Sequence, residues 1–530
     1  MYGFNCLWEA RREEREVVSN NNKIDYFKLL PLILGKISKV IDYIQIIIDK
    51  INNRMQGKYS PALIGIVAGI LGGIISIIML FIPPYLGMSD DGSFSKVMNS
   101  VGIYNLNDNK DLYFNYYVKT YSTVPSEVIE KSSYFSSLTV LVRLALILDN
   151  IFTRDTIFDM RFMALVYILI FIPTLMLIVK QAARRVNNFT EGAIIGAVGV
   201  LIFSDVSYIT YFSSFYSEAL IFISFLLCVG SVLSMQQEEN DIVWLVLYTL
   251  SGVFLILTEK QYALSGILLG TLAVSLNFIK KNFLWKVSCF IMGFILFISS
   301  IFSYYTIESD FDLASKYNSM TRGVLLQSTN PEETLSDFGI QPNYVILTDT
   351  NVNDFYPLTN ENNETLKYGF YDKYNTWDIA FYYLQHPGAM VSMIDIAVKS
   401  AFDIRISYSG NYEKSYGMPP KAKSLFFSVW SNFKSMSAPK TIGFLIVLFL
   451  GASIIFRKSI LGRRSRVVAE AMLLIGFVGL FQAILTIIMS GDSELNKHNF
   501  IFSVSIDLLS YFCFAEILHK LNIMQGGIKR

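Results

Sequence analysis

Residues 60–92 read SPALIGIVAGILGGIISIIMLFIPPYLGMSDDG, an apolar run that ends in an acidic pair. The stretch 61–83 has the length and composition that span a hydrocarbon core of about 30 Å. Asp90 and Asp91 follow within a few residues, directly before Gly92. The pair fits two interpretations: a turn that caps the next helix, or the working end of an enzyme whose substrates lie at the membrane surface.

Composition places the whole chain in the same class as this stretch. The 530 residues are 53% hydrophobic and 16% charged, with a mean hydropathy of +0.43, whereas soluble domains carry about 25% charged residues. The formal net charge is +1, so bulk charge gives no indication of a nucleic-acid partner, and none is expected. The sequence predicts an all-α polytopic membrane protein in contact with membrane lipids.

Ten transmembrane helices are predicted from apolar runs that are long enough to cross a bilayer. They lie at 61–83, 161–179, 191–208, 215–235, 243–258, 262–279, 285–305, 440–456, 469–489 and 499–518. The short loops KQAARR and RKSILGRRSR fall on the same side and are basic, and the positive-inside rule assigns that side to the cytoplasm. Both termini are therefore expected in the cytoplasm, and the large loops outside.

Three regions lie outside the predicted spans. Residues 1–60 include a cytoplasmic amphipathic helix expected at 26–54. The large first outer loop, 84–160, contains YFSSLTVLVRLALILD, which is too short and interrupted to span and indicates an interfacial helix. Residues 306–437 suffice for a small extracellular domain of α or mixed structure. The chain thus divides into 1–60, 61–305, 306–437 and 438–530.

Cysteine and histidine usage argues against two kinds of site. The four cysteines form no C-x-x-C pair, and there are only three histidines. A disulfide framework and a zinc or histidine-based metal site are therefore not expected. Asp90, Asp91 and Glu218 are candidates for an oxygen-ligand site for Mg²⁺ or Mn²⁺, although we expect no metal to be required.

Ionisable side chains gather at the predicted outer ends of the helices. Such groups are costly to keep near a bilayer, so they mark candidate sites. The polar set is Asp90, Asp91, Asp205, Glu218, Glu259, Lys260, Gln261, Asp492, Glu494, Lys497 and His498. Each one alone fits a cap, a turn or a solvated residue, but their gathering on one face favours a shared site. Asp507, about two turns into the last span, fits a structural hydrogen bond and a functional role equally well.

These residue types suit glycosyl transfer from a sugar carried on a lipid phosphate. A carboxylate can take the proton from an acceptor hydroxyl. The leaving phosphate needs cationic donors, for which Lys497 and His498 are suitable. Grooves between helices would hold the lipid, and the domain at 306–437 would hold the acceptor.

Four stretches resemble the GT-C superfamily of membrane glycosyltransferases. They are SDDG, DVSYITYFSSFYSEAL, TEKQY and GDSELNKHNFIFSVSID. More narrowly, KYNSMTRGVLLQSTNPEETLSDFGIQPNYVILTDTN resembles a segment of the hexose transferases that build surface-layer and cell-wall-associated glycans in Gram-positive bacteria. The resemblance covers most of residues 60–520 and leaves 1–60 uncovered.

The resemblance implies an inverting hexosyltransferase on the outer face of the bacterial cytoplasmic membrane. Its partners would be a polyprenyl-phosphate-linked hexose donor and a glycan or lipid-linked acceptor. It implies Asp90 as the general base beside Asp91, with Lys497, His498 and Lys260 near the donor phosphate. The other residues expected to bind substrate are Asp205, Tyr216, Glu218, Glu259, Gln261, Asp492, Glu494, Tyr317, Asn318 and Arg322.

Two departures from the family pattern leave questions open. Relatives carry Asp-Asn-Gly-Asp where this chain has Asp90-Asp91-Gly92-Ser93, so either acid can be the base. Arg322 stands where an aromatic residue is more usual, so the acceptor preference is open.

Three other functions compete with transfer of a single sugar. A flippase or transporter of lipid-linked sugars would favour internal repeats and charges near the bilayer midplane, and neither is evident. A polymerase or ligase of lipid-linked glycans shares the topology and the chemistry, so the sequence separates it poorly. An assembly or anchoring protein leaves the gathered acids unexplained.

Overall fold

The computed structural model describes most of the chain from residue 60 onward. The described residues are 46, 50, 52–54, 60–106, 112–124, 134–186, 188–235, 241–307, 311–351, 364–406, 408–461, 466–493 and 495–528. The chain divides into two compact units, Met1–Tyr59 with Asn187–Glu191, and Ser60–Val186 with Gly192–Arg530. The second unit holds the candidate site. Most of the helix predicted at 26–54, together with Glu494, lies outside the described residues.

Among the described residues, six helical segments are long and apolar enough to cross a membrane. They are Pro61–Phe81, Met160–Arg185, Lys260–Phe278, Phe283–Thr306, Val467–Ser490 and Phe500–Leu521. Two bent pairs raise the number to as many as eight: Phe189–Phe203 with Val206–Ser213, and Val429–Ser437 with Ile442–Phe456. The prediction of a multi-pass membrane protein is confirmed. The number of ten spans stays a prediction. The stretches 215–235 and 243–258, which complete the ten, form shorter apolar helices, Glu218–Ser234 and Asp241–Ile256.

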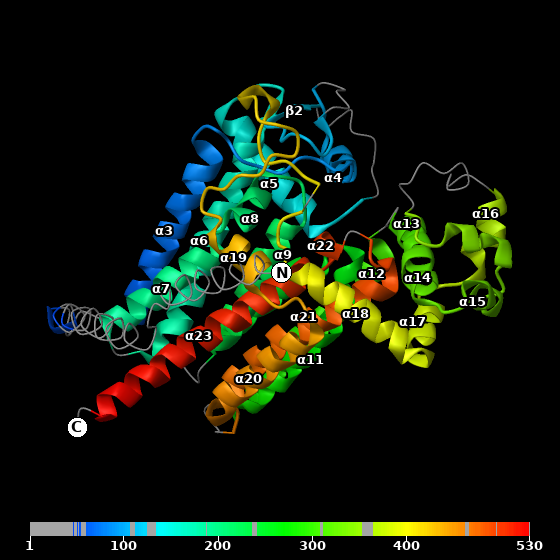
Figure 1. Ribbon diagram of the computed structural model, residues 1–530. Coiled ribbons are helices and arrows are strands. Elements are labelled where there is room, and N and C mark those ends of the chain that lie inside the picture. Colours follow the sequence, from blue (N-terminus) through cyan, green and yellow to red (C-terminus); the bar gives the residue numbers. More distant parts are fainter. Residues whose placement is uncertain are drawn as a thin grey trace, which may run out of the picture. The chain divides into compact units, whose positions relative to one another are not determined.

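The transmembrane part is built from helices, most of which are labelled in Figure 1. They are α3 (Pro61–Phe81), α6 (Met160–Ala182), α7 (Phe189–Phe203), α8 (Val206–Ile209), α9 (Glu218–Ser234), α10 (Asp241–Ile256), α11 (Ser265–Ser275), α12 (Phe283–Thr306), α20 (Ile442–Leu461), α21 (Arg466–Ser490), α22 (Leu495–His498) and α23 (Phe500–Ile528). Helix α9 is buried along nearly its whole length, so its sequence is apolar on all sides rather than amphipathic.

Helix α3, the apolar run of residues 61–83, packs closely against α6 because of its glycines. A Cβ atom at Gly65 would lie 2.5 Å from the Met176 carbonyl oxygen, and one at Gly69 would lie 2.3 Å from Met176 Cγ. Small residues let two helix backbones approach each other in this way. The opposite face of α3 exposes Ile66 and Ile70, as expected for a helix in contact with lipid.

One end of the bundle carries the long connections 82–159 and 307–441, and we call it the loop-bearing end. The first connection holds α4 (Phe94–Val101), α5 (Ser137–Phe152) and a three-stranded antiparallel sheet (Figure 1). The strands are β1 (Ile103–Tyr104), β2 (Thr120–Thr123) and β3 (Ile157–Asp159), in the order β1-β2-β3. The sequence analysis missed this sheet because strands of two to four residues are too short to show alternation.

Helix α5 fills the stretch in which an interfacial helix was predicted. Ser136 caps its first turn in a capping box with Thr139. Val140, Leu144 and Ile147 are exposed along one side of it, at the spacing of one helix face. The helix is confirmed, while its place at the membrane surface stays a prediction.

The second long connection contains a small helical region with its own core. Its helices are α13 (Phe311–Asn318), α14 (Leu325–Gln327), α15 (Pro331–Asp337), α16 (Glu364–Gly369), α17 (Thr376–Gln385) and α18 (Pro387–Ala401), with a π-helix at Ser319–Val324 between α13 and α14. Tyr317, Leu335, Phe370 and Tyr383 lie in this core, and Ile487 of α21 joins it. The region therefore packs onto the end of a transmembrane helix.

The rest of that connection returns to the segment after α3. Leu86 forms an isolated antiparallel bridge with Tyr412. Gly87 N donates to the Asn411 carbonyl at 3.1 Å, and Ser89 N donates to the Gly410 carbonyl at 3.0 Å. This pairing holds the chain directly before the acidic pair. Helix α19 (Val429–Ser437) then leads into α20 at an angle of 116°.

Candidate active site

The acidic pair forms a tight turn that begins α4. Asp90 Oδ1 accepts hydrogen bonds from Gly92 N at 2.7 Å and Phe94 N at 3.2 Å, and Asp91 Oδ1 accepts from Ser93 N at 3.0 Å. Gly92 has a φ of +99°, which favours glycine over any L-residue. The turn-and-cap interpretation therefore accounts for the Oδ1 atoms of Asp90 and Asp91. It does not account for their Oδ2 atoms.

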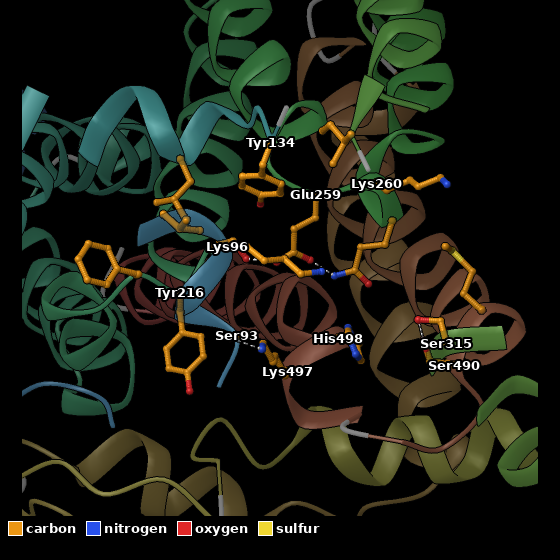
Figure 2. A pocket seen from close by; sticks show the side chains of 17 residues that line it. Ser93, Lys96, Tyr134, Tyr216, Glu259, Lys260, Ser315, Ser490, Lys497 and His498 are labelled. Atoms are coloured by element: carbon orange, nitrogen blue, oxygen red, sulfur yellow. Dashed lines mark hydrogen bonds between the residues drawn. The ribbon is translucent and has the colours of Figure 1, made fainter. Parts of the chain in front are cut away.

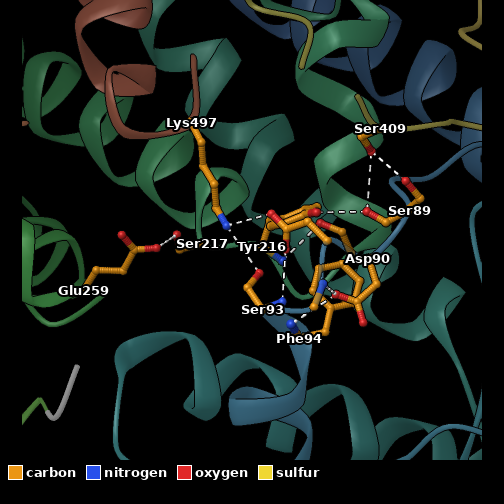
Figure 3. Close-up of polar contacts among 12 residues, drawn as sticks. Ser89, Asp90, Ser93, Phe94, Tyr216, Ser217, Glu259, Ser409 and Lys497 are labelled. Carbon is orange, nitrogen blue, oxygen red and sulfur yellow. Dashed lines mark hydrogen bonds and ion pairs between the residues drawn. The ribbon is translucent and has the colours of Figure 1, made fainter. Parts of the chain in front are cut away.

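The second oxygen of Asp91 is paired with Lys497, whose side chain Figure 3 shows beside Ser93. Lys497 Nζ lies 3.1 Å from Asp91 Oδ2 and donates to Ser93 Oγ at 3.3 Å. The side chains of Lys497 and Asp91 are only 8% and 5% exposed. The ammonium also lies 4.9 Å from the centre of the Tyr216 ring, a cation–π distance. Residues more than 400 positions apart in the sequence thus form one buried ion pair.

The two neighbouring acids differ in proton affinity. Burial raises the pKa of Asp90 to about 6, an effect that the hydrogen bonds from Gly92 and Phe94 reduce and the Asp91 charge increases. Burial also raises the pKa of Asp91, but the Lys497 ammonium and the hydrogen bonds from Ser93 outweigh it and hold that pKa below its usual value. Asp90 is therefore the stronger base of the two when ionised.

A cavity of about 150 Å³ lies beside the turn at the loop-bearing end, where Ser93 and Lys497 line it but neither Asp90 nor Asp91 does (Figure 2). It is lined by Ser93, Lys96, Val97, Tyr134, Leu138, Phe215, Tyr216, Ser217, Glu259, Lys260, Gln261, Ile307, Ser315, Met489, Ser490, Lys497 and His498. The lining carries three lysines and one glutamate. We call it the Lys497 cavity. Its charge suits an anionic ligand, and its aromatic and aliphatic walls suit a sugar ring or a lipid.

Glu259 is fixed on one side of the Lys497 cavity by its neighbours. Its Oε1 accepts a hydrogen bond from Ser217 Oγ, and its Oε2 accepts from Gln261 Nε2 at 2.6 Å. Ser217 directly precedes α9, whereas Glu259 and Gln261 come from the connection between α10 and α11. The short TEKQ connection therefore supplies a carboxylate, an ammonium and an amide to one wall.

Tyr216 joins the cavity wall to the segment that carries the acids. Its hydroxyl donates to the Ser89 carbonyl at 2.9 Å, and its ring meets Phe94 edge to face at 4.6 Å between centroids. Ser89 Oγ lies 2.9 Å from Ser409 Oγ. The position of Asp90 is thus determined from both sides, by Tyr216 before α9 and by the chain at 409–412.

Other predicted site residues lie at the same end of the bundle. His498 is buried and lines the Lys497 cavity, and burial lowers its pKa, so the neutral imidazole is favoured. Glu218 begins α9 and is 2% exposed, outside the cavity lining. Its Oε2 is buried without a hydrogen-bond partner among the described residues.

Three further predicted residues have hydrogen-bonding partners within the protein, and a role in substrate binding stays a prediction for them. Asp205 caps α8 by accepting from Ser207 N at 2.9 Å, and its other oxygen accepts from Ser431 N at 2.9 Å. Arg322 holds Asp492 through two hydrogen bonds, Nε to Oδ1 at 2.6 Å and Nη2 to Oδ2 at 3.1 Å. None of the three lines the Lys497 cavity.

The last two residues taken from the family pattern belong to the helical region at 311–401. The Tyr317 hydroxyl lies 2.6 Å from Thr350 Oγ1, and its ring is fully buried in the local core. Asn318 is 6% exposed at the start of the π-helix. Both lie outside the Lys497 cavity lining, so a role in substrate binding stays a prediction for them.

Sequence reasoning missed several residues of the cavity. Ser93, Lys96 and Tyr134 line it, yet each is an ordinary polar or aromatic residue of a loop or short helix. The one available signal was helical spacing, since Ser93 and Lys96 lie three residues apart at the start of α4 and therefore share a face. That signal needs the helix boundary, which the sequence analysis did not place.

No group of three His, Cys, Asp or Glu side chains converges as a metal site within the part of the chain that the structure describes. Lys497 occupies one side of the Asp91 carboxylate, the side that a cation would otherwise approach. That no metal is required stays a prediction, and chelation of the purified protein tests it.

Comparison with known proteins identifies one family. Residues 47–529 match the sequence model of a protein family described as the YfdI N-terminal transmembrane domain. Among curated proteins, none matches the chain significantly.

Two solved structures match the chain at low similarity. Both are of an oligosaccharyltransferase from Archaeoglobus fulgidus, one in the apo form and one, named AglB, in complex with an inhibitory peptide and a dolichol-phosphate. The identities are 10% and 11%, and each alignment covers 87% of this chain at a TM-score of 0.39. The chain spans about half, 51%, of the length of these proteins. At this TM-score the two matches carry no argument about activity.

Proposed function

The chain belongs to the family of the YfdI N-terminal transmembrane domain, and on that premise we propose that it is a membrane glycosyltransferase of GT-C type. The proposed reaction moves a hexose from a polyprenyl-phosphate-linked donor to a cell-surface glycan or a lipid-linked acceptor. The observation that carries the proposal is the Lys497 cavity, where a buried Asp91–Lys497 pair adjoins a space lined by lysines and aromatic rings.

The charges of the Lys497 cavity fit a phosphate leaving group. Lys96, Lys260 and Lys497 line it against Glu259, and Asp91 is paired with Lys497, so a phosphate would neutralise the positive charge that remains. Ammonium groups act on phosphate as point charges. Stabilising the charge that develops on the leaving group is the largest single contribution in many enzymes.

Asp90 is the proposed general base. It follows Ser89 in the turn whose Ser93 lines the cavity, and among the described residues no hydrogen-bond donor occupies its Oδ2. Asp90 takes the proton from the acceptor hydroxyl, and the acceptor oxygen bonds to the anomeric carbon. The bond from that carbon to the donor phosphate breaks, and the phosphate leaves with the electron pair. Its pKa of about 6 keeps Asp90 ionised and basic near neutral pH.

Asp91 is proposed as a positioning residue. Its ion pair fixes Lys497 Nζ between Ser93 and the Tyr216 ring. An ammonium held in place before the donor arrives needs no reorganisation during the reaction. The sequence left open which acid is the base. We assign proton transfer to Asp90, whose pKa is raised, and the positioning of Lys497 to Asp91.

The location of the reaction follows from the loops. The basic stretches 180–185 and 280–286 lie at the end of α6 and the start of α12, the helix ends away from the long connections. The positive-inside rule assigns the side with these basic stretches to the cytoplasm. We therefore place the cavity on the outer face of a bacterial cytoplasmic membrane. A lipid-linked donor reaches it from the outer leaflet.

The test is transfer of labelled hexose from polyprenyl-phosphate hexose by the purified chain. Asp90→Asn keeps an amide oxygen for Gly92 N and Phe94 N, so the turn survives while the base is lost, and we expect a loss of about 10²- to 10⁴-fold. Asp155→Asn is the matched control, an exposed acid of the same connection that accepts from Ile157 N. Full activity of both Asp90→Asn and Asp91→Asn would leave only the turn-and-cap role.

The cellular readout is the composition of the surface glycan. A strain lacking the protein should lose one hexose from that glycan, and Asp90→Asn should reproduce the loss at unchanged protein level. Loss of whole glycan repeats instead would indicate a polymerase or ligase. Accumulation of lipid-linked sugar on the inner leaflet would indicate a flippase.

A further inference from the structure

A second, smaller cavity lies beside the segment that leads to the acidic pair. It measures about 10 Å³, the space of one oxygen atom. Its lining is Met88, Val206, Ser207, Thr210, Tyr211, Ile404, Arg405, Ile406, Ser409, Asn411 and Lys423. Arg405 and Lys423 are the half-buried members, and the others are buried. We call it the Arg405 cavity, and nothing in the proposed reaction uses it.

The edge of the Arg405 guanidinium that can donate two parallel hydrogen bonds has no partner among the described residues. Its Nε and Nη2 atoms are buried and have no hydrogen-bond partner among the described residues. In Arg322, the same Nε and Nη2 atoms bind the two oxygens of Asp492 at 2.6 and 3.1 Å. That edge of a guanidinium matches two oxygens of a carboxylate or phosphate. In this protein, the Nε–Nη2 edge of Arg322 therefore binds a carboxylate, whereas the same edge of Arg405 binds none among the described residues.

Lys423 adds a second cation to the same cavity. Its Nζ donates to the Ile406 carbonyl, and an ammonium has three protons to donate. Burial, together with the Arg405 charge, lowers the pKa of Lys423 to about 8. Burial also lowers the pKa of Arg405. Two partly buried like charges therefore destabilise each other there.

The nearby acids are committed to other groups. Asp205 and Asp403 are the carboxylates that act on the two cations electrostatically. Asp205 accepts from Ser207 N and Ser431 N. Asp403 binds Lys440 Nζ at 2.8 Å and Ser435 Oγ at 2.6 Å. Neither acid forms an ion pair with Arg405 or Lys423 among the described residues, so the positive charge is left for a ligand.

We propose that the Arg405 cavity is a second anion site, which binds a phosphate group between Arg405 and Lys423. One phosphate oxygen enters the cavity, and the others stay at its half-buried mouth. A guanidinium edge together with an ammonium suits a phosphate better than a carboxylate, because a phosphate offers more oxygens and more charge. The site stands apart from the proposed sugar transfer and does not depend on it.

The Arg405 cavity is mechanically tied to the acidic pair. Ser409 and Asn411 line it, and both hold the chain before Asp90: Ser409 Oγ bonds Ser89 Oγ at 2.9 Å, and Asn411 Nδ2 donates to the Gly87 carbonyl at 2.9 Å. A phosphate at Arg405 would therefore fix the segment 86–91. Both cationic cavities then touch the segment that carries the acids, the first at Ser93 and the second at Met88.

The experiment measures phosphate binding by the full chain in a phosphate-free sugar detergent. Two ligands are titrated, inorganic phosphate and polyprenyl monophosphate, with chloride and the parent polyprenol as controls. The variants are Arg405→Gln and Lys423→Gln, with Lys421→Gln as the matched control, because Lys421 is exposed and lies two residues from Lys423. Lys497→Met is measured in the same way, so that phosphate bound in the Lys497 cavity is counted separately.

For at least one of the two ligands, we expect two phosphate sites in the wild type and in Lys421→Gln. We expect one site in Arg405→Gln and one in Lys497→Met, with at least tenfold weaker binding at the altered site. Loss for the lipid ligand identifies a lipid phosphate as the occupant, and loss for inorganic phosphate alone identifies free phosphate. Without ligand, Arg405→Gln should melt no lower than the wild type, because an unpartnered buried charge is removed.

The proposal is overturned if Arg405→Gln and Lys423→Gln both bind each ligand within twofold of the wild type. It is also overturned if chloride competes as well as phosphate. If Lys497→Met changes nothing while Arg405→Gln removes a site, the proposed donor site fails and the second anion site stands. If the reverse holds, the second anion site fails and the donor site stands.

Discussion

In the part of the chain that the structure describes, two pairs of lysine and aspartate are buried on both sides, and they differ in what surrounds them. Lys434 of α19 lies 2.7 Å from Asp507 Oδ1 of α23, with side chains 3% and 0% exposed. Lys497 lies 3.1 Å from Asp91 Oδ2, with side chains 8% and 5% exposed. The residue types and the burial are nearly the same, so neither explains the difference.

The Lys434–Asp507 pair is surrounded by hydrogen-bonding partners. Asp507 Oδ2 accepts from the Tyr208 hydroxyl at 2.5 Å and from Trp430 Nε1 at 2.9 Å. Lys434 Nζ also donates to Ser503 Oγ at 2.8 Å. The pair joins α19 to α23 and adjoins neither the Lys497 cavity nor the Arg405 cavity. Of the two roles that the sequence left open for Asp507, the structure shows the structural one.

The Asp91–Lys497 pair instead lies beside a cavity. Lys497 lines a cavity of about 150 Å³ together with two other lysines. A ligand can therefore reach the ammonium, whereas protein groups surround Lys434. The comparison teaches that a buried ion pair indicates function through the space beside it and not through its charges alone.

The largest expected effect is on stability, from Lys434→Met. It leaves the Asp507 carboxylate buried without its cation, which costs about 3–5 kcal/mol. Heat unfolding of the purified chain measures it as a lower midpoint. Lys434→Met with Asp507→Leu removes both charges and should recover much of the loss. A single variant as stable as the wild type would contradict the structural role.

The next effect is on activity, from Lys497→Met. We expect hexose transfer to fall about 10²-fold, as on removal of one transition-state donor. The midpoint of unfolding should fall less than in Lys434→Met, since the cavity lets water reach Asp91. Lys497→Arg keeps the charge and should retain more activity. If both lysine variants lose stability equally, the two pairs play the same role.

A smaller effect is the pH dependence set by Asp90. Its pKa is raised to about 6 in the folded protein, from 3.8, so transfer should rise about tenfold per pH unit below 6 and level off above it. Stability responds with the opposite sign. The contribution of Asp90 is full below pH 3.8 and is lost as the pH rises through 6, because the folded state binds the proton more tightly.

The measurement for Asp90 pairs kcat/KM with the unfolding midpoint from pH 4 to 8. In Asp90→Asn, the residual transfer activity should no longer rise with pH, and the unfolding midpoint should change less with pH than in the wild type. A wild-type transfer rate that is constant from pH 5 to 7 would exclude Asp90 as the base.

The smallest effect is expected from Lys440→Met. Lys440 pairs with Asp403 at 2.8 Å, but the two side chains are 31% and 36% exposed. Solvent screens such a pair, so its loss costs about 0–1 kcal/mol. The same unfolding experiment measures it and provides the exposed reference for Lys434→Met. A loss equal to that of Lys434→Met would show that burial does not separate the pairs.

The class of fold was predictable because it depends on composition. Apolar runs of membrane-spanning length are readable without neighbours, and all the predicted spans coincide with helices in the structure. The small sheet at 103–159 was not predictable, because its strands are short and their partners are distant in sequence. The pairing of Arg322 with Asp492 was likewise hidden, because it joins residues 170 positions apart.

The gathering of site residues was predictable only in part. Spacing placed Glu259, Lys260, Lys497 and His498 at one end of the bundle, and all four line the Lys497 cavity. Asp205 was assigned to the same set on the same reasoning, yet its carboxylate caps α8. Position along the membrane normal follows from span boundaries, whereas position around the bundle depends on how the helices are rotated and packed.

The sequence by itself determined that the chain crosses a membrane many times and that an acidic turn follows its first apolar run. Both are local properties, set by the length of a run and by the Asp-Asp-Gly turn. Only the tertiary structure decided that Lys497 pairs with Asp91, that Asp507 pairs with Lys434, and that the bidentate edge of Arg405 is left open. Each of these depends on side chains that packing brings together from distant parts of the chain.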